Sequence, residues 1–325
     1  MPIRTLFNIL KLAYTPISSY EFSIVKDDDL IKSYINTGKL YIIAQRPVLT
    51  FENLNLDRSN ELDPYFTFEI HQRGGTNHLK GRVQLYQPKF GNDTHRGLQI
   101  GVTYAYPKPV DTSDSFPFNS VANFVLRSET DTYIWLSPEK LLYHHLRDTI
   151  DAEITGNIET FLRYNVHYIG KATKQDLVKR LTGHSHLQDI LSLETPFHYG
   201  SLPTDEIALL FFDFEDNLLM KTFGEDDPLD EAVDMVMGKY EVEEETIYLD
   251  AEKALINALK PKHNRQLYTN YPNSVDGLAK HDLALYSYSI KDPITLVYTD
   301  GEIRGGADKL IIKKGLPLRI QKGDE

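Results

Sequence analysis

Two segments, VHYIGKATKQDLVKRLTGH (166–184) and EKALINALKPKHN (252–264), decide how this chain is interpreted. The first places Tyr168 in a short apolar run that is typical of a strand. Arg180 and His184 follow at a spacing of four, so on a helix their side chains lie on one face, one turn apart. A guanidinium can hold a phosphate through two hydrogen bonds, and a histidine beside it can move a proton near neutral pH. Taken alone, the two residues also fit an ordinary basic pair on a helix surface.

Glu252 is informative because it lies on the apolar face of a predicted helix that starts at Asp250. With Leu255, Ile256 and Leu259 it forms the i, i+3, i+4, i+7 stripe that should face a core. A charged carboxylate there is costly unless it is paired or binds a metal. The alternative is a glutamate in the first helical turn, behind an Asp250 cap, where the helix dipole favours it.

The order of residue types resembles that of the GIY-YIG nucleases over roughly residues 164–270. The resemblance is carried by Tyr-Ile-Gly at 168–170, the Arg and His four residues apart, and Glu252 followed twelve residues later by Asn264. It implies an α+β protein in which a small mixed sheet flanked by helices cuts DNA with Mg²⁺ or Mn²⁺.

The resemblance also implies roles for individual residues. Glu252 would hold the metal ion, and Arg180 would bind the scissile phosphate and offset charge in the transition state. Tyr168 would orient or activate the attacking water, which requires nearby cations to lower its pKa. His184 would be a second group that transfers a proton or contacts phosphate.

Two further residues would support this chemistry. Lys171 would depress a tyrosine pKa or contact phosphate, and Asn264 would buttress the site by hydrogen bonding. Flanking cations that we expect to contact nucleic acid are Lys174, Lys179, Lys262 and Arg265.

One element of the family pattern is not evident in the sequence. A strand reading roughly Gly-Ile-Tyr should precede Tyr168 by ten or more residues, but the segment there is helix-like. Tyr164 is the nearest candidate for its tyrosine, because residues four apart on a strand share a face. Otherwise another tyrosine or a histidine such as His167 serves, or the enzyme is impaired.

A chain of 325 residues is long for one domain, so we expect two. Residues 1–135 are predicted to form a β-rich domain, a sandwich or partly open barrel, that recognises the target or a partner. Residues 136–325 are predicted to form the nuclease domain, with its core at about 164–270 and a C-terminal β extension at 280–318.

The net charge of −12 argues at first against a polyanionic substrate. However, residues 213–252 hold 15 acidic and 2 basic residues, so the rest of the chain stands at +1. Residues 163–184 carry five basic residues and one acidic residue, and a local basic site can bind DNA or RNA on an acidic protein. The acidic segment 213–252 is predicted to repel non-target DNA or to dock a basic protein partner.

The stretch 71–110 mixes basic and aromatic residues. These are Arg73, Lys80, Arg82, Lys89, Arg96 and Lys108, with Tyr86, Phe90, Tyr104 and Tyr106 between them. They fit a nucleic-acid surface. They fit better the polar face and aromatic core of a β meander, which we favour.

The composition narrows the class of protein. With no cysteine, disulfide and thiolate–zinc chemistry are excluded, and no apolar run reaches membrane-spanning length, so we expect a cytoplasmic protein. The leading hypothesis is a metal-dependent DNA endonuclease in restriction, phage defence or mobile-element biology. The alternative is a nucleic-acid-binding or assembly subunit with an inactive nuclease fold. A zinc hydrolase that uses His144, His145, His184 and His186 is disfavoured, because adjacent helix positions diverge by about 100°.

Overall fold

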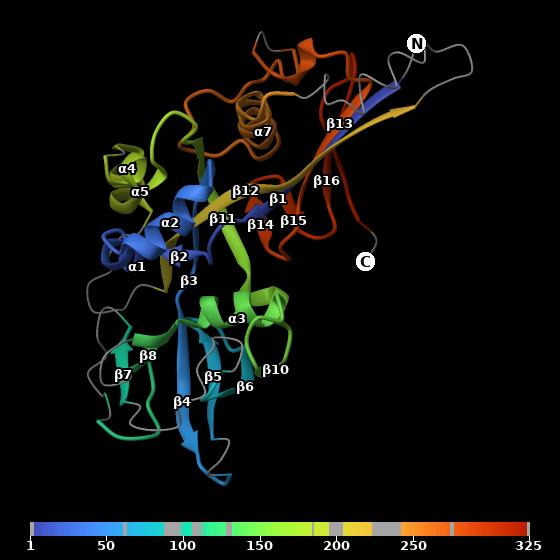
Figure 1. Cartoon of the computed structure of the whole chain (residues 1–325). Coiled ribbons are helices and arrows are strands. Elements are labelled where there is room, and N and C mark those ends of the chain that lie inside the picture. Colours follow the sequence, from blue (N-terminus) through green and yellow to red (C-terminus); the bar gives the residue numbers. More distant parts are fainter. Residues whose placement is uncertain are drawn as a thin grey trace.

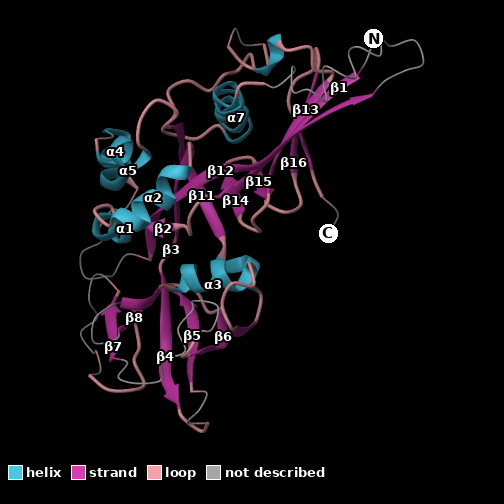
Figure 2. Cartoon of the chain, viewed as in Figure 1, coloured by secondary structure: helices cyan, strands magenta, loops and turns pink. Residues whose placement is uncertain are grey.

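The computed structural model describes residues 3–60, 64–87, 99–105, 112, 114–127, 132–183, 185–194, 204–222, 242–273 and 276–323. As the sequence predicts, the protein belongs to the mixed α+β class. Two sheets and several helices make up the described part of the chain (Figures 1 and 2). None of its helices is both long and apolar enough to cross a membrane.

The larger sheet contains ten strands of the described part, in the order β15-β14-β11-β3-β12-β1-β13-β16-β17, with β2 pairing with β12. Their bounds are β1 Ile3–Leu12, β2 Ile17–Ser18, β3 Leu40–Pro47, β11 Arg163–Lys171, β12 Asp205–Thr222, β13 Leu285–Ile290, β14 Thr295–Tyr298, β15 Gly301–Arg304, β16 Lys309–Lys313 and β17 Arg319–Gln321. The sequence EIALLFFDF predicts a buried central strand, and β12 confirms it, since it lies between β3 and β1 with Ile207–Phe212 buried.

The smaller sheet has the order β10-β6-β5-β4-β8-β7, with β9 pairing with β8. Its strands are β4 Leu49–Asp57, β5 Tyr65–Gln72, β6 His78–Gln84, β7 Gln99–Tyr104, β8 Val121–Arg127, β9 Thr132–Leu136 and β10 Ala152–Thr155. Alternating residues of these antiparallel strands point inward, and Phe51, Phe66, Phe68 and Phe124 are buried. This sheet occupies the lower half of Figure 1.

The two sheets are not consecutive along the chain. Strand β3 continues into β4 at Val48, and the chain returns to the larger sheet at β11. Strands β1, β2 and β3, which the sequence analysis grouped with the β-rich residues 1–135, therefore hydrogen-bond with the C-terminal half of the protein. The smaller sheet is an insertion between two neighbouring strands of the larger one.

The C-terminal strands join the same sheet. Strand β13 pairs in parallel with β1, and β14 pairs in parallel with β11. The sequence predicts a hairpin turn at Asp300-Gly301. The hairpin forms between β14 and β15, but its turn residues are Thr299 and Asp300, because Gly301 already pairs with Tyr298. The predicted extension 280–318 is thus part of the central architecture.

Helices cover both faces of the larger sheet. They are α1 Ser19–Val25, α2 Asp29–Thr37, α3 Pro138–Leu146, α4 Leu177–Thr182, α5 Ser185–Leu193 and α7 Glu244–Leu259, with 3₁₀ turns at Ile158–Phe161 and Leu278–Lys280. Helices α1, α2, α4 and α5 gather on one side of β3, β11 and β12, and α7 packs on the other (Figure 1).

The sequence predicts a single helix from about Lys174 to Leu191, but the structure has two helices there, α4 and α5. Asp176 caps the first, accepting a hydrogen bond from the Lys179 N–H, and Gly183 ends it. The residues Ser137-Pro138 predict the start of a helix, with serine as the cap and proline in the first turn. The start of α3 confirms this, because the Ser137 hydroxyl accepts a hydrogen bond from the backbone N–H of Lys140.

The prediction that the last helix starts at Asp250 is wrong. Helix α7 begins at Glu244, and Asp250 lies inside it, fully buried. Its carboxylate accepts hydrogen bonds from the Tyr271 hydroxyl at 2.6 Å, the Leu278 N–H at 2.7 Å and the Tyr288 hydroxyl at 2.8 Å. Asp250 therefore ties α7 to β13 instead of capping a helix.

The sequence predicts that the acidic residues 225–248 form a solvated insertion, but its last residues, from Glu244 on, belong to α7. Residues 213–222 continue β12 beside β1, and residues 244–252 form the first half of α7. The short helix predicted in EAVDMVMGKY (231–240) lies outside the described residues.

Candidate active site

Two tyrosines meet where β3 and β11 run antiparallel. The register places Gly170 opposite Tyr41, and the rings of Tyr41 and Tyr168 lie 6.0 Å apart between centroids. Each of the two hydroxyls also perturbs the pKa of the other. Tyr41 was not among the residues selected from the sequence, and the structure makes it the nearest neighbour of the Tyr-Ile-Gly motif.

Gly170 makes this pairing possible. A Cβ atom at this position would lie 2.6 Å from Cζ and Oη of Tyr41 and 2.8 Å from Cε1 of Tyr168. Real Cβ atoms essentially never approach other atoms so closely. Glycine is thus required at 170 because two aromatic rings fill the space that a side chain would occupy.

Arg180 joins the two tyrosines from α4. Its guanidinium acts electrostatically on both Tyr41 and Tyr168 and opposes the rise in their pKa values. Leu177, Val178 and Leu181 bury the other face of α4, so Arg180 stays exposed beside the tyrosines. An exposed guanidinium next to two phenols can receive a phosphate.

Residues from the N-terminal segment also position α4. Asn36 of α2 accepts hydrogen bonds through Oδ1 from the N–H groups of Leu177 at 3.0 Å and Val178 at 3.2 Å. Its Nδ2 donates to Asp176 at 2.6 Å. The start of the helix that bears Arg180 is therefore fixed by the same part of the chain that supplies Tyr41.

Glu252 lies against the end of β11. It is 9% exposed, and its Oε2 accepts a hydrogen bond from Lys171 Nζ at 2.5 Å. Its charge also raises the pKa of Tyr168, so the carboxylate acts electrostatically on the tyrosine pair. The ion pair with Lys171 provides the compensation that a carboxylate on a buried helix face requires.

The two tyrosines remain protonated near neutral pH. Burial is the main cause that raises the pKa of Tyr41 and of Tyr168, and the nearby Arg180 offsets only part of the effect. Tyr168 can act as a base only if its pKa falls, and this requires the negative charge of Glu252 to be neutralised.

Asn264 holds the backbone of the Tyr-Ile-Gly strand. Its Nδ2 donates to the Ile169 carbonyl at 2.8 Å, and its Oδ1 accepts from the Ile169 N–H at 2.9 Å. Strand β14 pairs with β11 only at residues 163–165, so it does not reach Ile169. The side chain of Asn264 therefore satisfies the backbone N–H and carbonyl of Ile169 in place of a neighbouring strand. This arrangement matches the buttressing role expected from the resemblance.

Tyr164 is not brought to this cluster, and the expectation that it shares a face with Tyr168 is wrong. A register shift between Val166 and Tyr168 adds one residue to β11, which reverses the alternation of side chains. Tyr164 therefore packs into the core on the α7 side of the sheet, whereas Tyr168 packs on the α4 side. It is fully buried, with Arg46 stacked over its ring at 5.9 Å.

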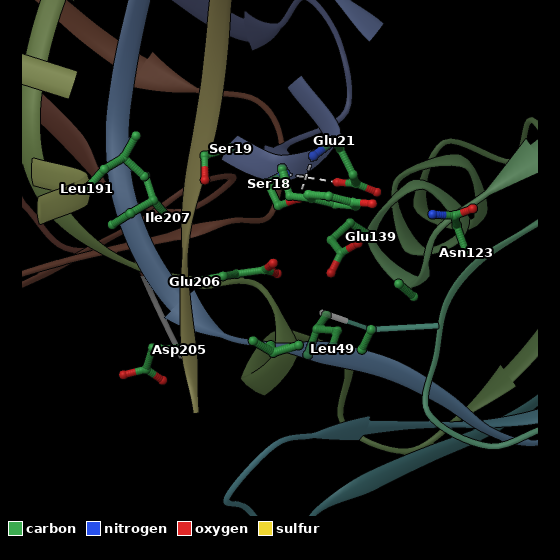
Figure 3. A pocket seen from close by; sticks show the side chains of 14 residues that line it. Ser18, Ser19, Glu21, Leu49, Asn123, Glu139, Leu191, Asp205, Glu206 and Ile207 are labelled. Carbon is green, nitrogen blue, oxygen red and sulfur yellow. Dashed lines mark hydrogen bonds between the residues drawn. The ribbon is translucent and has the colours of Figure 1, made fainter. Parts of the chain in front are cut away.

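Arg46 belongs to a second polar cluster at the junction of the two sheets. Its Nη2 lies 2.6 Å from Glu139 of α3 and 3.0 Å from Glu206 of β12. Figure 3 shows Glu21, Glu139 and Glu206 around one cavity there. Burial raises the pKa of Glu206 to about 8 and that of Glu21 to about 7. This cavity contains none of the predicted catalytic residues.

The remaining predicted residues are scattered. Lys174, Lys179 and Arg265 are exposed, whereas Lys262 donates to Glu194 at 2.7 Å. His184 lies outside the described residues. The carboxylate of Glu194 therefore holds the head group of Lys262.

Two basic residues of the smaller sheet, Arg82 and Lys80, are paired with acids. Arg82 donates to Glu153 at 2.6 Å, and Lys80 lies 3.3 Å from Glu69. These pairs favour the polar face of a meander over a nucleic-acid surface. On α3, His144 hydrogen-bonds with the Thr149 hydroxyl at 2.8 Å. This contact fits a structural role for His144 better than a role as a zinc ligand.

Comparisons with protein-family models, with curated proteins and with solved structures found no match to this chain. The interpretation of the site therefore depends on its residues and their geometry.

Replacing Gly170 by alanine tests the packing of the tyrosine pair. We expect Gly170→Ala to lower the free energy of unfolding by about 1–3 kcal/mol, because the new methyl group overpacks two rings. Urea denaturation measures the change. Gly183→Ala is the matched control, since its Cβ would meet only the Lys179 carbonyl at 3.8 Å. Equal stability of Gly170→Ala and the wild type would contradict the packing described above.

The carboxylate cavity predicts a pH dependence of stability. Folding raises the pKa of Glu206 to about 8. Above the ordinary pKa of a glutamate, the unfolded chain has therefore released a proton that the folded protein still holds. Stability should therefore fall as pH rises from about 5 to 8, and Glu206→Gln should reduce this fall. Arg46, Arg73, Glu139 and Glu21 are the charged groups that act on Glu206. Thermal unfolding at several pH values measures the effect, and parallel curves for both proteins would argue against it.

Proposed function

We propose that this protein is a divalent-metal-dependent endonuclease that hydrolyses DNA phosphodiester bonds and has a GIY-YIG-like arrangement. The observation that carries the proposal is that Tyr41, Tyr168 and Arg180 come together in one electrostatically interacting group, with the Lys171–Glu252 pair beside it. These residues come from two strands and two helices that are far apart in the sequence. Their convergence combines a phosphate-binding cation, proton-transfer groups and a metal-binding carboxylate.

Strand β3 supports the proposal by supplying what the sequence pattern lacked. The segment GKLYI (38–42) has a glycine, Gly38, just before β3 and a tyrosine, Tyr41, on β3. This strand runs antiparallel to Tyr168-Ile169-Gly170. It lies far upstream because the smaller sheet is inserted between β3 and β11. In this proposal Tyr41 takes the place of the missing first-motif tyrosine, and Tyr164 has no catalytic role.

The residues around Glu252 fit a hard divalent ion. A single carboxylate such as Glu252 suits Mg²⁺ or Mn²⁺, because these ions bind through one or two protein carboxylates and keep several water ligands. When bound, the ion would offset the negative charge that develops on the phosphate. Lys171, released from Glu252, would then be free to contact a phosphate oxygen.

The protein side chains would carry the remaining steps of hydrolysis. Arg180 would bind the scissile phosphate through two hydrogen bonds, and the hydroxyls of Tyr41 and Tyr168 would orient the water that attacks phosphorus. The new P–O bond forms as the bond to the leaving sugar oxygen breaks. The proton lost by the water passes to the tyrosine cluster or to solvent, and the leaving oxygen takes up a proton.

The smaller sheet is proposed to recognise the target or a partner, since the catalytic residues all lie outside it. We propose that the enzyme acts in the cytoplasm, in restriction, phage defence or mobile-element biology.

The alternative is an inactive nuclease fold that binds nucleic acid or assembles with other subunits. Two observations favour it: Lys171 already neutralises Glu252, and burial raises the pKa values of both tyrosines. A protein of this kind would bind DNA with strong salt dependence and leave it uncut.

Cleavage of plasmid DNA tests the proposal. The wild type should nick or linearise DNA with Mg²⁺ or Mn²⁺, and Glu252→Gln and Arg180→Lys should each lower the rate by about 100-fold or more, because each removes an interaction with the developing charge. Glu244→Gln, in the exposed first turn of the same helix, is the matched control and should cut normally.

Two results would decide against the proposal. Full activity in both Glu252→Gln and Arg180→Lys would show that the site is elsewhere. A wild type that binds DNA but never cuts it with any divalent ion would establish the inactive alternative.

A further inference from the structure

Three potential metal ligands meet at His167, the residue that precedes Tyr168 on β11. His167 of β11, Glu194 just after α5 and His263 beyond α7 each offer one ligand atom, and these atoms all lie within 4.8 Å of one another. All three residues are half-buried. Among the described residues, they form the one group of this kind.

The cluster already has part of the geometry of a metal site. Nε2 of His263 and Oε1 of Glu194 are 2.8 Å apart, and the two imidazole rings are nearly perpendicular, with centroids 6.1 Å apart. A tetrahedral site with bonds of about 2.0–2.2 Å needs ligand atoms about 3.3 Å apart. Small side-chain rotations of His167 and His263 therefore suffice to close the site.

The three side chains form a ligand set that suits zinc, since two imidazoles and one carboxylate commonly bind this ion. Lys262 Nζ donates a hydrogen bond to Glu194 Oε1 at 2.7 Å, and His263 Nε2 lies 2.8 Å from the same oxygen. The carboxylate of Glu194 is therefore already the point at which the polar groups of this cluster meet.

Neighbouring groups orient the three ligands. Gln45 Oε1 accepts a hydrogen bond from His167 Nε2 at 3.1 Å, while Gln45 Nε2 donates to the backbone carbonyl of Glu194 at 2.8 Å. The His263 N–H donates to the His167 carbonyl at 3.0 Å. Such outer contacts fix ring orientation in metal sites.

We propose that His167, Glu194 and His263 bind one Zn²⁺ or similar borderline transition-metal ion, with water as the fourth ligand. This site is distinct from the hard-cation position at Glu252, because its donors are two nitrogens and one oxygen. Lys262, which now bonds to Glu194, moves into solvent when the ion binds.

The ion would act as a structural clamp. It would join β11 to the segments that follow α5 and α7, and each histidine neighbours a residue of the candidate active site, Tyr168 or Asn264. Binding to the folded state alone would stabilise the protein. The proposal does not depend on nuclease activity, and binding alone tests it.

The test is metal binding to the full-length, chelator-treated protein. We expect one Zn²⁺ per chain by titration calorimetry and elemental analysis, and an intense visible spectrum with Co²⁺ that reports a four-coordinate site. His167→Gln and His263→Gln should weaken Zn²⁺ binding by about 100-fold or more, since each removes a direct ligand. Zn²⁺ should raise the Tm of the wild type and leave that of His263→Gln unchanged.

Two controls separate this site from other metal binding. His144→Gln removes a histidine outside the cluster, and Glu252→Gln removes the proposed hard-cation ligand; both should bind Zn²⁺ as the wild type does. Circular dichroism checks that each variant folds. If the wild type takes up no stoichiometric Zn²⁺ or Co²⁺, the cluster is only a hydrogen-bonded network and the proposal is wrong. Unchanged binding in folded His167→Gln and His263→Gln would also overturn it.

Discussion

The antiparallel pairing of β3 with β11 is the constraint on which the candidate site depends. It sets Gly170 opposite Tyr41, and because glycine has no side chain, the rings of Tyr41 and Tyr168 can meet over it. A shift of the pairing by one residue would turn one tyrosine to the other face of the sheet. The electrostatic interaction of that tyrosine with Arg180 would then be lost together with the ring contact.

The surrounding elements attach to this strand pair. From one side, α4 brings Arg180, with its first turn held by Asn36 of the N-terminal segment. From the other side, α7 brings Glu252 to the end of β11, and Asn264 secures the strand backbone. The smaller sheet leaves β3 and returns at β11, so an entire sheet is accommodated without disturbing the pairing.

The sequence predicts part of the local geometry of the site. Asn264 is expected to support the site by hydrogen bonding, and it bonds to the backbone of Ile169. Lys171 is expected to act on a tyrosine or a phosphate, and its ion pair with Glu252 was not anticipated. Sequence reasoning missed Tyr41, because its partner lies beyond the inserted sheet and no local pattern reports a contact at that separation. The GKLYI segment was the available signal, since it combines a glycine with a strand tyrosine.

Two errors have definite physical causes. Tyr164 was expected beside Tyr168, but a bulge in β11 reverses the alternation, and sequence patterns give no sign of that extra residue. Asp250 looked like a helix cap, since aspartate favours that position. Its true partners, which include Tyr271 and Tyr288, come from later segments, so only the tertiary structure explains its burial.

The central claim is that Tyr41, and not Tyr164, completes the site with Tyr168. Comparing DNA cleavage by Tyr41→Phe and Tyr164→Phe tests it most directly, because each variant removes a single hydroxyl. The account predicts that Tyr41→Phe lowers the rate by about 100-fold or more, as expected for loss of a proton-transfer or orienting group. It predicts near wild-type cleavage for Tyr164→Phe, whose buried hydroxyl has no hydrogen-bond partner in the described part of the chain. Wild-type activity in Tyr41→Phe together with inactivity in Tyr164→Phe would contradict the account.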